Sequence, residues 1–254
     1  MAKMPGHRTR TDNLIKLKKM NVVSIMAHQD DEMRCLGTML KCRARGDQLH
    51  FITLTDGSGG FVGRPQLTRE KAAGIRHTEM TALADGIGAK LINLRERDEF
   101  LYDTADLRLK LIEAIRRTGA DLVFTHYYRD YNEDHVTTHR LVRHCCMQAA
   151  LDLLPMESPF LKAHPAIFCV EPHMPIPFPV THFVDITEYE SEKVRLLQLH
   201  ESQEEAMRMA CGTGFEKICE QPGAYWGEKA GCEYAEAFVS MRARGAIKPF
   251  AVLP

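Results

Sequence analysis

Several features that would assign a protein to a familiar class are absent from this sequence. Its eight cysteines include no Cys-x-x-Cys pair, which argues against a zinc ribbon and a thioredoxin-like motif. No apolar run reaches the roughly 18 residues of a membrane-spanning helix, and no Gly-x-Gly-x-x-Gly or P-loop lysine marks a nucleotide site. The formal net charge of −1 gives no overall attraction for nucleic acid. We therefore expect no membrane span and no nucleic-acid partner.

Length and composition predict one large globular domain. The chain has 254 residues, of which 44% are hydrophobic and 26% are charged, and both fractions are ordinary for a folded domain. Single cores stop growing only near about 250–300 residues, so we expect one domain over residues 21–254. Because the sequence carries no secretory signal, we expect free, mostly buried thiols and a cytoplasmic protein.

Residues 1–20 differ from the rest in charge, with six basic side chains against one acidic side chain. Within them, "NLIKLKKM" has the composition of a short amphipathic helix for a membrane surface, or of a nucleic-acid arm. The segment lacks the apolar stretch of a signal peptide. We favour a solvated basic leader that precedes the first strand.

After residue 20 the sequence alternates between strand and helix patterns. Short apolar runs predict strands at 22–27, 49–55, 89–94 and 121–127, and amphipathic segments predict helices at 33–45, 68–85, 104–118 and 134–154. Later strands are predicted near 166–171, 181–186 and 234–241, with a helix over 188–210. This alternation predicts a Rossmann-like α/β fold, in which a mostly parallel sheet carries helices on both faces.

Three polar loops follow the predicted strands. "AHQDDE" comes after the first strand, "DGSGG" after the second and "HYYRDYNEDH" after the fourth. Ligands of parallel α/β sheets bind outside the carboxyl ends of the strands. We therefore expect these loops to form one site at the same edge of the sheet.

The first of these loops contains a metal-binding pattern. His28 and Asp31 lie three residues apart directly after a strand, where a turn can bring both side chains to one point. Neutral imidazole and carboxylate both bind Zn²⁺, and a catalytic zinc site takes three protein ligands and a water. His135, at a predicted helix N-terminus, is the third ligand on this edge. One zinc ion, or another divalent cation, would also offset the repulsion between Asp30 and Asp31.

Asp30 is adjacent to one ligand and is itself free to reach an activated water. Zinc lowers the pKa of water from 15.7 to roughly 7, so a carboxylate within hydrogen-bond distance can take its proton at neutral pH. This arrangement predicts amide hydrolysis with Asp30 as the general base. Two alternatives stay open: residues 28–32 as a solvated acidic turn, and His139 as a further ligand rather than a residue of the helix surface.

"AHQDDE" (27–32) and "DYNEDH" (130–135) together resemble the motifs of the LmbE-like, or PIG-L, family of zinc-dependent N-deacetylases. That family's first motif is Ala-His-Pro-Asp-Asp-Glu, and its second motif ends in Asp-His. "IRHTEMTALADGIGA" (75–89) is similar to the family's Arg-x-x-Glu helix, and "KVRLLQLHESQ" (193–203) to its Lys…His-x-Ser-Gln segment. The resemblance covers most of residues 21–240.

The resemblance implies the same three metal ligands and the same general base. It further implies that Arg76 lies near the substrate and that Asp98, in "LRERDEF", binds it. The implied reaction is hydrolysis of the acetamide of an N-acetylated small molecule, with an N-acetyl amino sugar or its glycoside as the favoured substrate.

Two positions depart from the family pattern. Gln29 replaces the usual proline, which removes no ligand, so little chemical consequence is expected. Asn132 stands where many relatives have a histidine that stabilises the oxyanion or protonates the amine. Asparagine can donate a hydrogen bond but cannot transfer a proton. We therefore predict that Asn132 is an oxyanion donor and Asp30 the sole acid and base, with His126 and His200 as the candidates for a substitute in the substrate pocket.

Two other functions remain as alternatives. A metal-dependent amidase that removes a larger acyl group would differ only in the depth of its pocket beyond the metal. A family member that binds a ligand without turnover is supported only by Asn132. The sequence leaves open the substrate, the metal used in the cell and assembly into a homo-oligomer.

Overall fold

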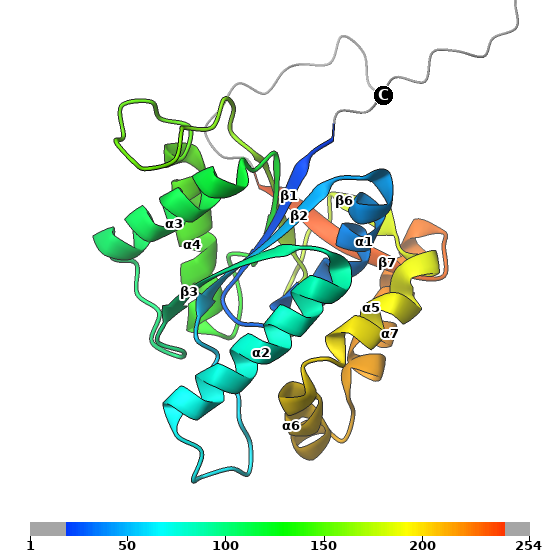
Figure 1. Cartoon of the computed structure of the whole chain (residues 1–254). Coiled ribbons are helices and arrows are strands. Elements are labelled where there is room, and N and C mark those ends of the chain that lie inside the picture. Colours follow the sequence, from blue (N-terminus) through cyan, green and yellow to red (C-terminus); the bar gives the residue numbers. More distant parts are fainter. Residues whose placement is uncertain (1–18, 242–254) are drawn as a thin grey trace, which may run out of the picture.

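Within the part of the chain that the structure describes, seven strands form one central sheet (Figure 1). The computed structural model describes residues 19–241. The strands are β1 (Asn21–Met26), β2 (Gln48–Thr55), β3 (Lys90–Glu96), β4 (Leu122–Thr125), β5 (Ala166–Val170), β6 (His182–Asp185) and β7 (Ala235–Met241). Their order is β3-β2-β1-β4-β5-β7-β6. Strands β1 to β5 run parallel, whereas β7 is antiparallel to β5 and β6.

The strand order brings the polar loops together. The chain moves outward from β1 through β2 to β3 and then returns to β4 and β5 on the other side of β1. The direction therefore reverses between β1 and β4, which is the position where open α/β sheets bind ligands. Val22 of β1 pairs with Leu122 of β4, so the residues that follow these two strands lie next to each other.

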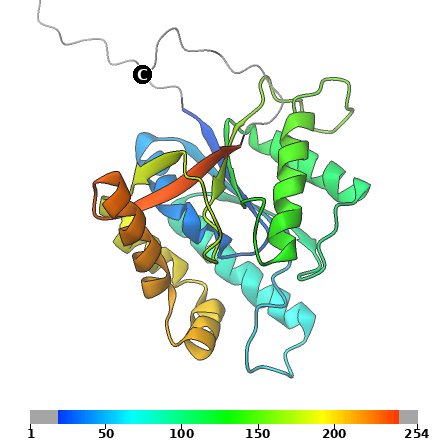
Figure 2. The same cartoon turned by 180° about the vertical axis from the view of Figure 1, so that it is seen from behind.

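Helices cover both faces of the sheet, which confirms the predicted fold (Figures 1 and 2). One face carries α3 (Ala105–Thr118) and α4 (Glu133–Gln148), and the other carries α1 (Leu36–Arg45), α2 (Arg69–Ile87), α5 (Glu190–Leu197) and α7 (Phe215–Ala230). Successive side chains of a strand point to opposite faces, so Phe51 joins one apolar core and Ile52 the other. Burial of each such side chain contributes roughly 1.5–3 kcal/mol, and the two cores hold the strand ends in place.

A side chain from β7 caps the start of α1, close to the first polar loop. The residue before α1, Cys35, makes no side-chain cap. Instead, the Glu236 carboxylate accepts hydrogen bonds from the Gly37 and Thr38 amides at 2.9 and 2.7 Å. Lys193 of α5 lies 3.1 Å from Glu236 and compensates its buried charge. Strand β7 therefore fixes the segment that follows the first polar loop.

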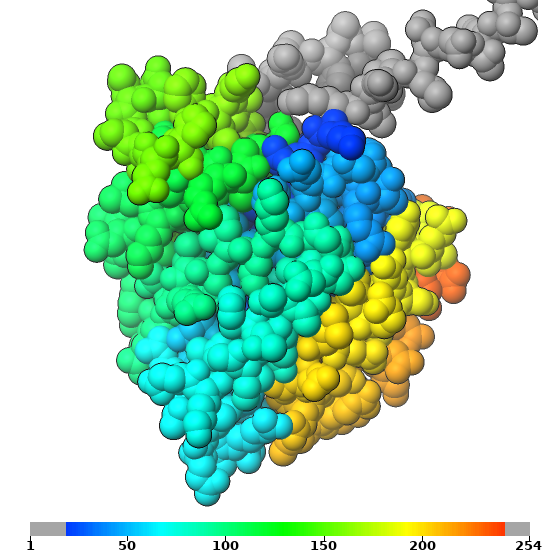
Figure 3. Space-filling model, in the orientation of Figure 1, coloured from blue at the N-terminus to red at the C-terminus, as the bar shows by residue number. Residues whose placement is uncertain are grey.

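The region after β6 differs from the sequence-based expectation. The helix predicted over 188–210 is divided into α5 and α6 (Glu201–Cys211), because the chain turns at His200, whose ring bonds to the buried Glu32. Helix α7 was not predicted, since it contains Pro222, which normally interrupts a helix. Figure 3 shows the segment of α5 and α6 lying against α2 on the surface of the molecule.

Helix α4 ends earlier than expected, at Gln148 rather than at residue 154. The buried Arg116 of α3 donates hydrogen bonds to the carbonyls of Ala149, Leu151 and Leu154. The Arg116 side chain thus supplies the hydrogen bonds that these carbonyls would otherwise accept from the amides of a further helical turn. The end of α4 is therefore set by a contact between elements distant in sequence.

Two expectations concern chain segments that are only partly described. Most of the basic leader over residues 1–20, and the predicted domain beyond residue 241, lie outside the described residues. Among residues 19–241, no helix combines the length and apolar character needed to cross a membrane.

Candidate metal centre and active site

Three side chains, two from the turn after β1 and one from the first turn of α4, converge at the carboxyl ends of β1 and β4. His28 Nδ1 lies 3.2 Å from Asp31 Oδ2 and 3.2 Å from His135 Nε2, and His135 Nε2 lies 3.3 Å from Asp31 Oδ1. Donor atoms around a tetrahedral zinc ion with bonds of about 2.0 Å stand about 3.3 Å apart. The structure thus brings together the three residues predicted as ligands, and their spacing fits one cation.

The turn after β1 explains why residues three apart meet. Asp30 has a φ of 97°, in the left-handed region, which costs a residue other than glycine of order 1–3 kcal/mol. The His28 amide donates to Asp31 Oδ2 at 2.8 Å, and the Met33 amide donates to the Asp30 carbonyl at 3.0 Å. These bonds close the turn, so His28 and Asp31 face the same point.

Helix α4 presents His135 from its first turn. Asn132 caps this helix, because its Oδ1 accepts from the Asp134 and His135 amides at 2.8 and 3.4 Å. The His135 ring stacks on His126 with 3.9 Å between ring centroids. His126 is 3% exposed, and its Nε2 accepts from the Ala27 amide at 3.0 Å. His126 therefore supports a ligand from behind, and the substrate contact expected for it does not fit its position.

Each ligand histidine has a carboxylate beside its other nitrogen. Asp98 Oδ1 lies 3.0 Å from His28 Nε2, and Asp130 Oδ2 lies 3.1 Å from His135 Nδ1. Carboxylates in this position fix the tautomer that turns the remaining nitrogen toward a metal. Asp98 also accepts from the Gly59 amide at 2.6 Å. We expected Asp98 to bind substrate; it lines the cavity over the candidate ligands, and its place beside His28 also suits the positioning of a ligand.

Replacing Asp98 by asparagine should weaken zinc binding roughly 10- to 100-fold, the usual effect of losing an outer carboxylate. The asparagine keeps the size of the side chain but no longer holds His28 by charge. Competition with a zinc chelator measures the dissociation constant. The exposed Asp106 provides a matched control, because Asp106→Asn should bind zinc like the wild type. Equal affinities in the two variants would contradict the positioning role.

Electrostatics at this point favours a cation. Burial alone would raise the pKa of Asp31, but His135 outweighs it and holds this pKa well below the usual range. Burial lowers the pKa of His135, yet Asp31 and Asp130 bring it up to about 9. The pKa of His28 is raised well above its ordinary value, because Asp134 and Asp31 overcome the effect of burial. The carboxylates around both rings thus favour positive charge at this point, which a metal ion would supply when the histidines bind it as neutral ligands.

Asp30 lies next to the candidate ligand Asp31 and is held by two buried charged side chains, Arg76 and Glu32. Arg76 donates to Asp30 Oδ1 at 3.1 Å and to the Gln29 carbonyl, and Glu32 Oε2 accepts from the Asp30 amide at 3.1 Å. Asp30 Oδ2 has no hydrogen-bond partner within residues 19–241. Burial raises the pKa of this carboxyl to about 6 against the attraction of Arg76. Arg76, expected near the substrate, borders the cavity, and its Nη2 holds Asp30 while its Nη1 lies 3.5 Å from Glu79.

His200 does not reach the cavity. Its side chain is 0% exposed, and its Nε2 lies 3.0 Å from Glu32 Oε1. Two residues further on, Ser202 donates from its amide and its hydroxyl to Glu79, both at 2.7 Å. The side chain that we expected to contact substrate is therefore buried away from the cavity lining. Through its bond to Glu32, His200 connects the start of α6 to the turn that carries Asp30.

The glycine loop after β2 forms one wall of the site. Gln29 Nε2 donates to the Thr55 carbonyl at 3.1 Å, and Gln29 Oε1 lies against Gly57. Gly57 has a φ of 67°, and a Cβ there would overlap the glutamine oxygen. The glutamine that replaces the family's proline thus has a structural consequence that sequence reasoning did not anticipate, since it joins the metal-binding loop to the glycine loop.

A cavity of about 340 Å³ opens over the three ligands. Its lining includes Gly57, Gly60, Tyr131, Asn132, Gln203 and an apolar wall of Met33, Met207 and Ile218. It also includes His173, which sequence reasoning missed. His173 follows β5 in a proline-rich segment, and no spacing relates it to the other motifs. Burial and the nearby Arg34 lower its pKa to about 3, so its ring is neutral.

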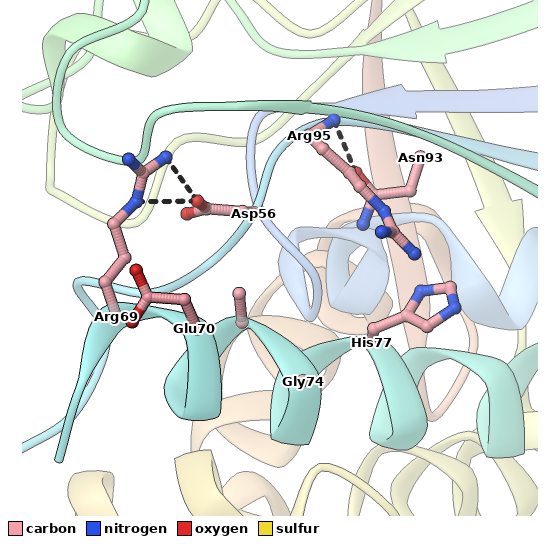
Figure 4. A pocket seen from close by; sticks show the side chains of 8 residues that line it. Asp56, Arg69, Glu70, Gly74, His77, Asn93 and Arg95 are labelled. Atoms are coloured by element: carbon pink, nitrogen blue, oxygen red, sulfur yellow. Dashed lines mark hydrogen bonds and ion pairs between the residues drawn. The ribbon is translucent and has the colours of Figure 1, made fainter.

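A second cavity, of about 380 Å³, lies between α2 and β3 (Figure 4). Arg69 binds Asp56 there at 2.9 and 2.5 Å, and Asp56 Oδ1 accepts from the Ser58 amide at 3.1 Å. Asp56 begins the glycine loop, whose Gly57 and Gly60 line the first cavity. The charges of the second cavity therefore anchor a wall of the candidate active site.

Comparisons with known proteins give a partial match to one family model and a shared fold. Residues 23–146 match the family model for PIG-L, GlcNAc-PI de-N-acetylase. A conserved protein from Thermus thermophilus is 25% identical, with a TM-score of 0.74 over 90% of this chain and 97% of that chain. The N,N'-diacetylchitobiose deacetylase from Pyrococcus horikoshii is 24% identical, with a TM-score of 0.76 over 91% of this chain and 87% of that chain.

A further similar structure has a different activity. The 4-carboxy-2-hydroxymuconate hydratase from Pseudomonas putida is 21% identical, with a TM-score of 0.75 over 90% of this chain and 99% of that chain. The same fold thus carries a deacetylase and a hydratase, so the fold alone does not select a reaction. The side chains around the cavity have to carry the functional assignment.

Proposed function

We propose that this protein is a zinc-dependent N-deacetylase of a small N-acetyl amino sugar or its glycoside, since residues 23–146 match the PIG-L family model. One observation carries the proposal: His28 Nδ1, His135 Nε2 and the Asp31 carboxylate lie within 3.2–3.3 Å of one another, in a cavity that Asp30 also lines. The family and the chitobiose deacetylase among the similar structures support the same class of substrate.

The three ligands would hold one Zn²⁺, or another divalent cation, which supplies Lewis acidity toward water and an amide carbonyl. Asp30 takes the proton of the attacking water at Oδ2, because Arg76 occupies Oδ1. The same carboxyl then returns this proton to the nitrogen of the departing amine. Asp98 and Asp130 keep the ligand histidines oriented throughout.

Asn132 keeps its proposed part in stabilising the carbonyl oxygen. Its Oδ1 is used by the cap of α4, so Nδ2 is the donor left for a substrate in the cavity that Asn132 lines. An amide group donates a neutral hydrogen bond and transfers no proton. Asp30 is therefore the only group assigned to acid–base chemistry.

The apolar wall of the cavity supports the alternative function, a metal-dependent amidase that removes a larger acyl group. Met33, Met207 and Ile218 lie on one side of the lining, where a longer hydrocarbon chain could be buried at about 0.8 kcal/mol per CH₂. A series of N-acyl chain lengths on one amino sugar distinguishes the two reactions. The proposed deacetylase prefers acetyl, whereas the alternative amidase gains rate with each added carbon.

Amine release from N-acetylated sugars tests the proposed function directly. We expect the zinc-loaded protein to release amine from at least one N-acetyl amino sugar or glycoside. Removing the metal with a chelator should lower the rate roughly tenfold or more, and added zinc should restore it. The measurement is fluorescent labelling of the free amine over a panel of N-acetyl sugars. An inactive zinc-loaded protein on the whole panel would contradict the proposal.

A further inference from the structure

One imidazole lines the candidate active site without belonging to the ligand set. His173 is 24% exposed, and its Nε2 lies 3.9 Å from Asp31 Oδ1. Its ring centroid is 6.2 Å from that of His135. His173 therefore borders the metal centre from the side of β5, while its nitrogen atoms stay outside the compact group of ligand atoms.

Arg34 determines which nitrogen of His173 carries the proton. Arg34 Nη2 lies 3.4 Å from His173 Nδ1. A guanidinium group has only donors, so Nδ1 must be the acceptor of this hydrogen bond. In a neutral imidazole the proton then sits on Nε2, the nitrogen that lies toward Asp31. His173 is thus a fixed hydrogen-bond donor at the edge of the cavity.

Pro222 accounts for the position of Arg34. In α7 this proline has no N–H to donate to the carbonyl of Ile218, four residues earlier. Arg34 Nη1 donates to that carbonyl at 3.4 Å, and the same nitrogen lies 3.9 Å from Glu171 Oε2. The helix defect therefore provides an acceptor that anchors Arg34. A proline in α7 is connected in this way to the orientation of a histidine beside the metal centre.

We propose that His173 is a catalytic residue whose Nε2–H donates to the substrate carbonyl oxygen as that oxygen becomes negative. The inference rests on the proposed amide hydrolysis. When water adds to the carbonyl carbon, the C=O pair moves onto the oxygen and Asp30 takes the water proton. When the C–N bond breaks, the pair returns to C=O and the amine leaves with the proton from Asp30. His173 transfers no proton and supplies the imidazole that Asn132 lacks.

Two substitutions at position 173 separate the donor from the bulk of the ring. His173→Phe keeps a planar ring without a donor, and kcat should fall about 10²- to 10³-fold with little change in KM. His173→Gln carries an amide N–H near the place of Nε2, so it should recover at least about tenfold of that loss. Asn132→Asp serves as the comparison, because it keeps the cap of α4 and removes the amide donor.

Two readouts do not depend on turnover. Stoichiometric zinc should remain in both position-173 variants, because His173 is not a ligand. In the metal-free protein with ¹⁵N-labelled histidine, NMR should find the proton of His173 on Nε2. In Arg34→Met this preference should be lost, because nothing then holds Nδ1 as an acceptor.

Three results would overturn the assignment: a proton on Nδ1, zinc loss in His173→Phe, or a kcat for that variant within about threefold of the wild type. If the wild type releases no amine at all, the proposed function fails. The tautomer and zinc measurements would then still decide whether His173 is a fixed donor outside the ligand set.

Discussion

The Asp30→Asn variant is expected to lose about 10²- to 10⁴-fold in kcat, the range typical of general acid–base catalysis, while it keeps its zinc. Asparagine has the size of aspartate and can still accept from Arg76, which lies 3.1 Å from Oδ1 in the wild type. At the free oxygen, however, it can no longer take a proton from water. Because Asp31 and both ligand histidines are unchanged, metal binding should remain.

Steady-state kinetics of amine release, combined with elemental analysis for zinc, measures this effect. Asp85→Asn is the matched control, since Asp85 is exposed at the end of α2 and far from the ligands in sequence. It should behave like the wild type in both measurements. If Asp30→Asn retained more than about a hundredth of wild-type turnover, Asp30 would not be the general base.

The His135→Ala variant should lose stoichiometric zinc and, with it, amine release. His135 Nε2 lies 3.2 Å from His28 Nδ1 and 3.3 Å from Asp31 Oδ1, and the two protein ligands left without it do not make a catalytic zinc site. The loss in affinity should exceed the roughly 10- to 100-fold effect of an outer carboxylate. Elemental analysis after dialysis gives the zinc content per chain.

His139→Ala tests the alternative ligand of the same helix. His139 Nδ1 lies 2.9 Å from the His126 carbonyl, and the residue is not part of the candidate ligand group within residues 19–241. This variant should therefore retain its zinc. Zinc loss in His139→Ala, or stoichiometric zinc in His135→Ala, would show that the ligand set is different.

Much of the fold could be predicted from local patterns. The apolar runs of β1, β2, β3 and β4 are bounded by polar residues and glycines, so their positions and order of appearance follow from the sequence. Helix α7 could not be predicted, because Pro222 is compatible with a helix only where Arg34 takes up the free carbonyl of Ile218. That compensation comes from a residue of the N-terminal half.

The candidate site divides in the same way. His28 and Asp31 follow from spacing, since a turn at a strand end joins residues three apart. The family resemblance implied a substrate contact for Asp98, and His200 was a candidate for the substrate pocket. Their actual neighbours, His28 for one and Glu32 for the other, belong to a loop far away in the chain. Long-range pairing therefore places Asp98 beside a candidate ligand at the lining of the cavity, and His200 beneath the turn that carries Asp30.

The sequence by itself determined the parallel α/β architecture and the loops that carry ligand-type residues, because strand, turn and cap preferences act over a few residues. The tertiary structure alone decided which distant side chains share the cavity. The reversal of strand order between β1 and β4 brings His135 to His28 and Asp31. The packing of α7 on Arg34 fixes the ring of His173. Such contacts depend on the order of strands and the packing of helices, which no local pattern encodes.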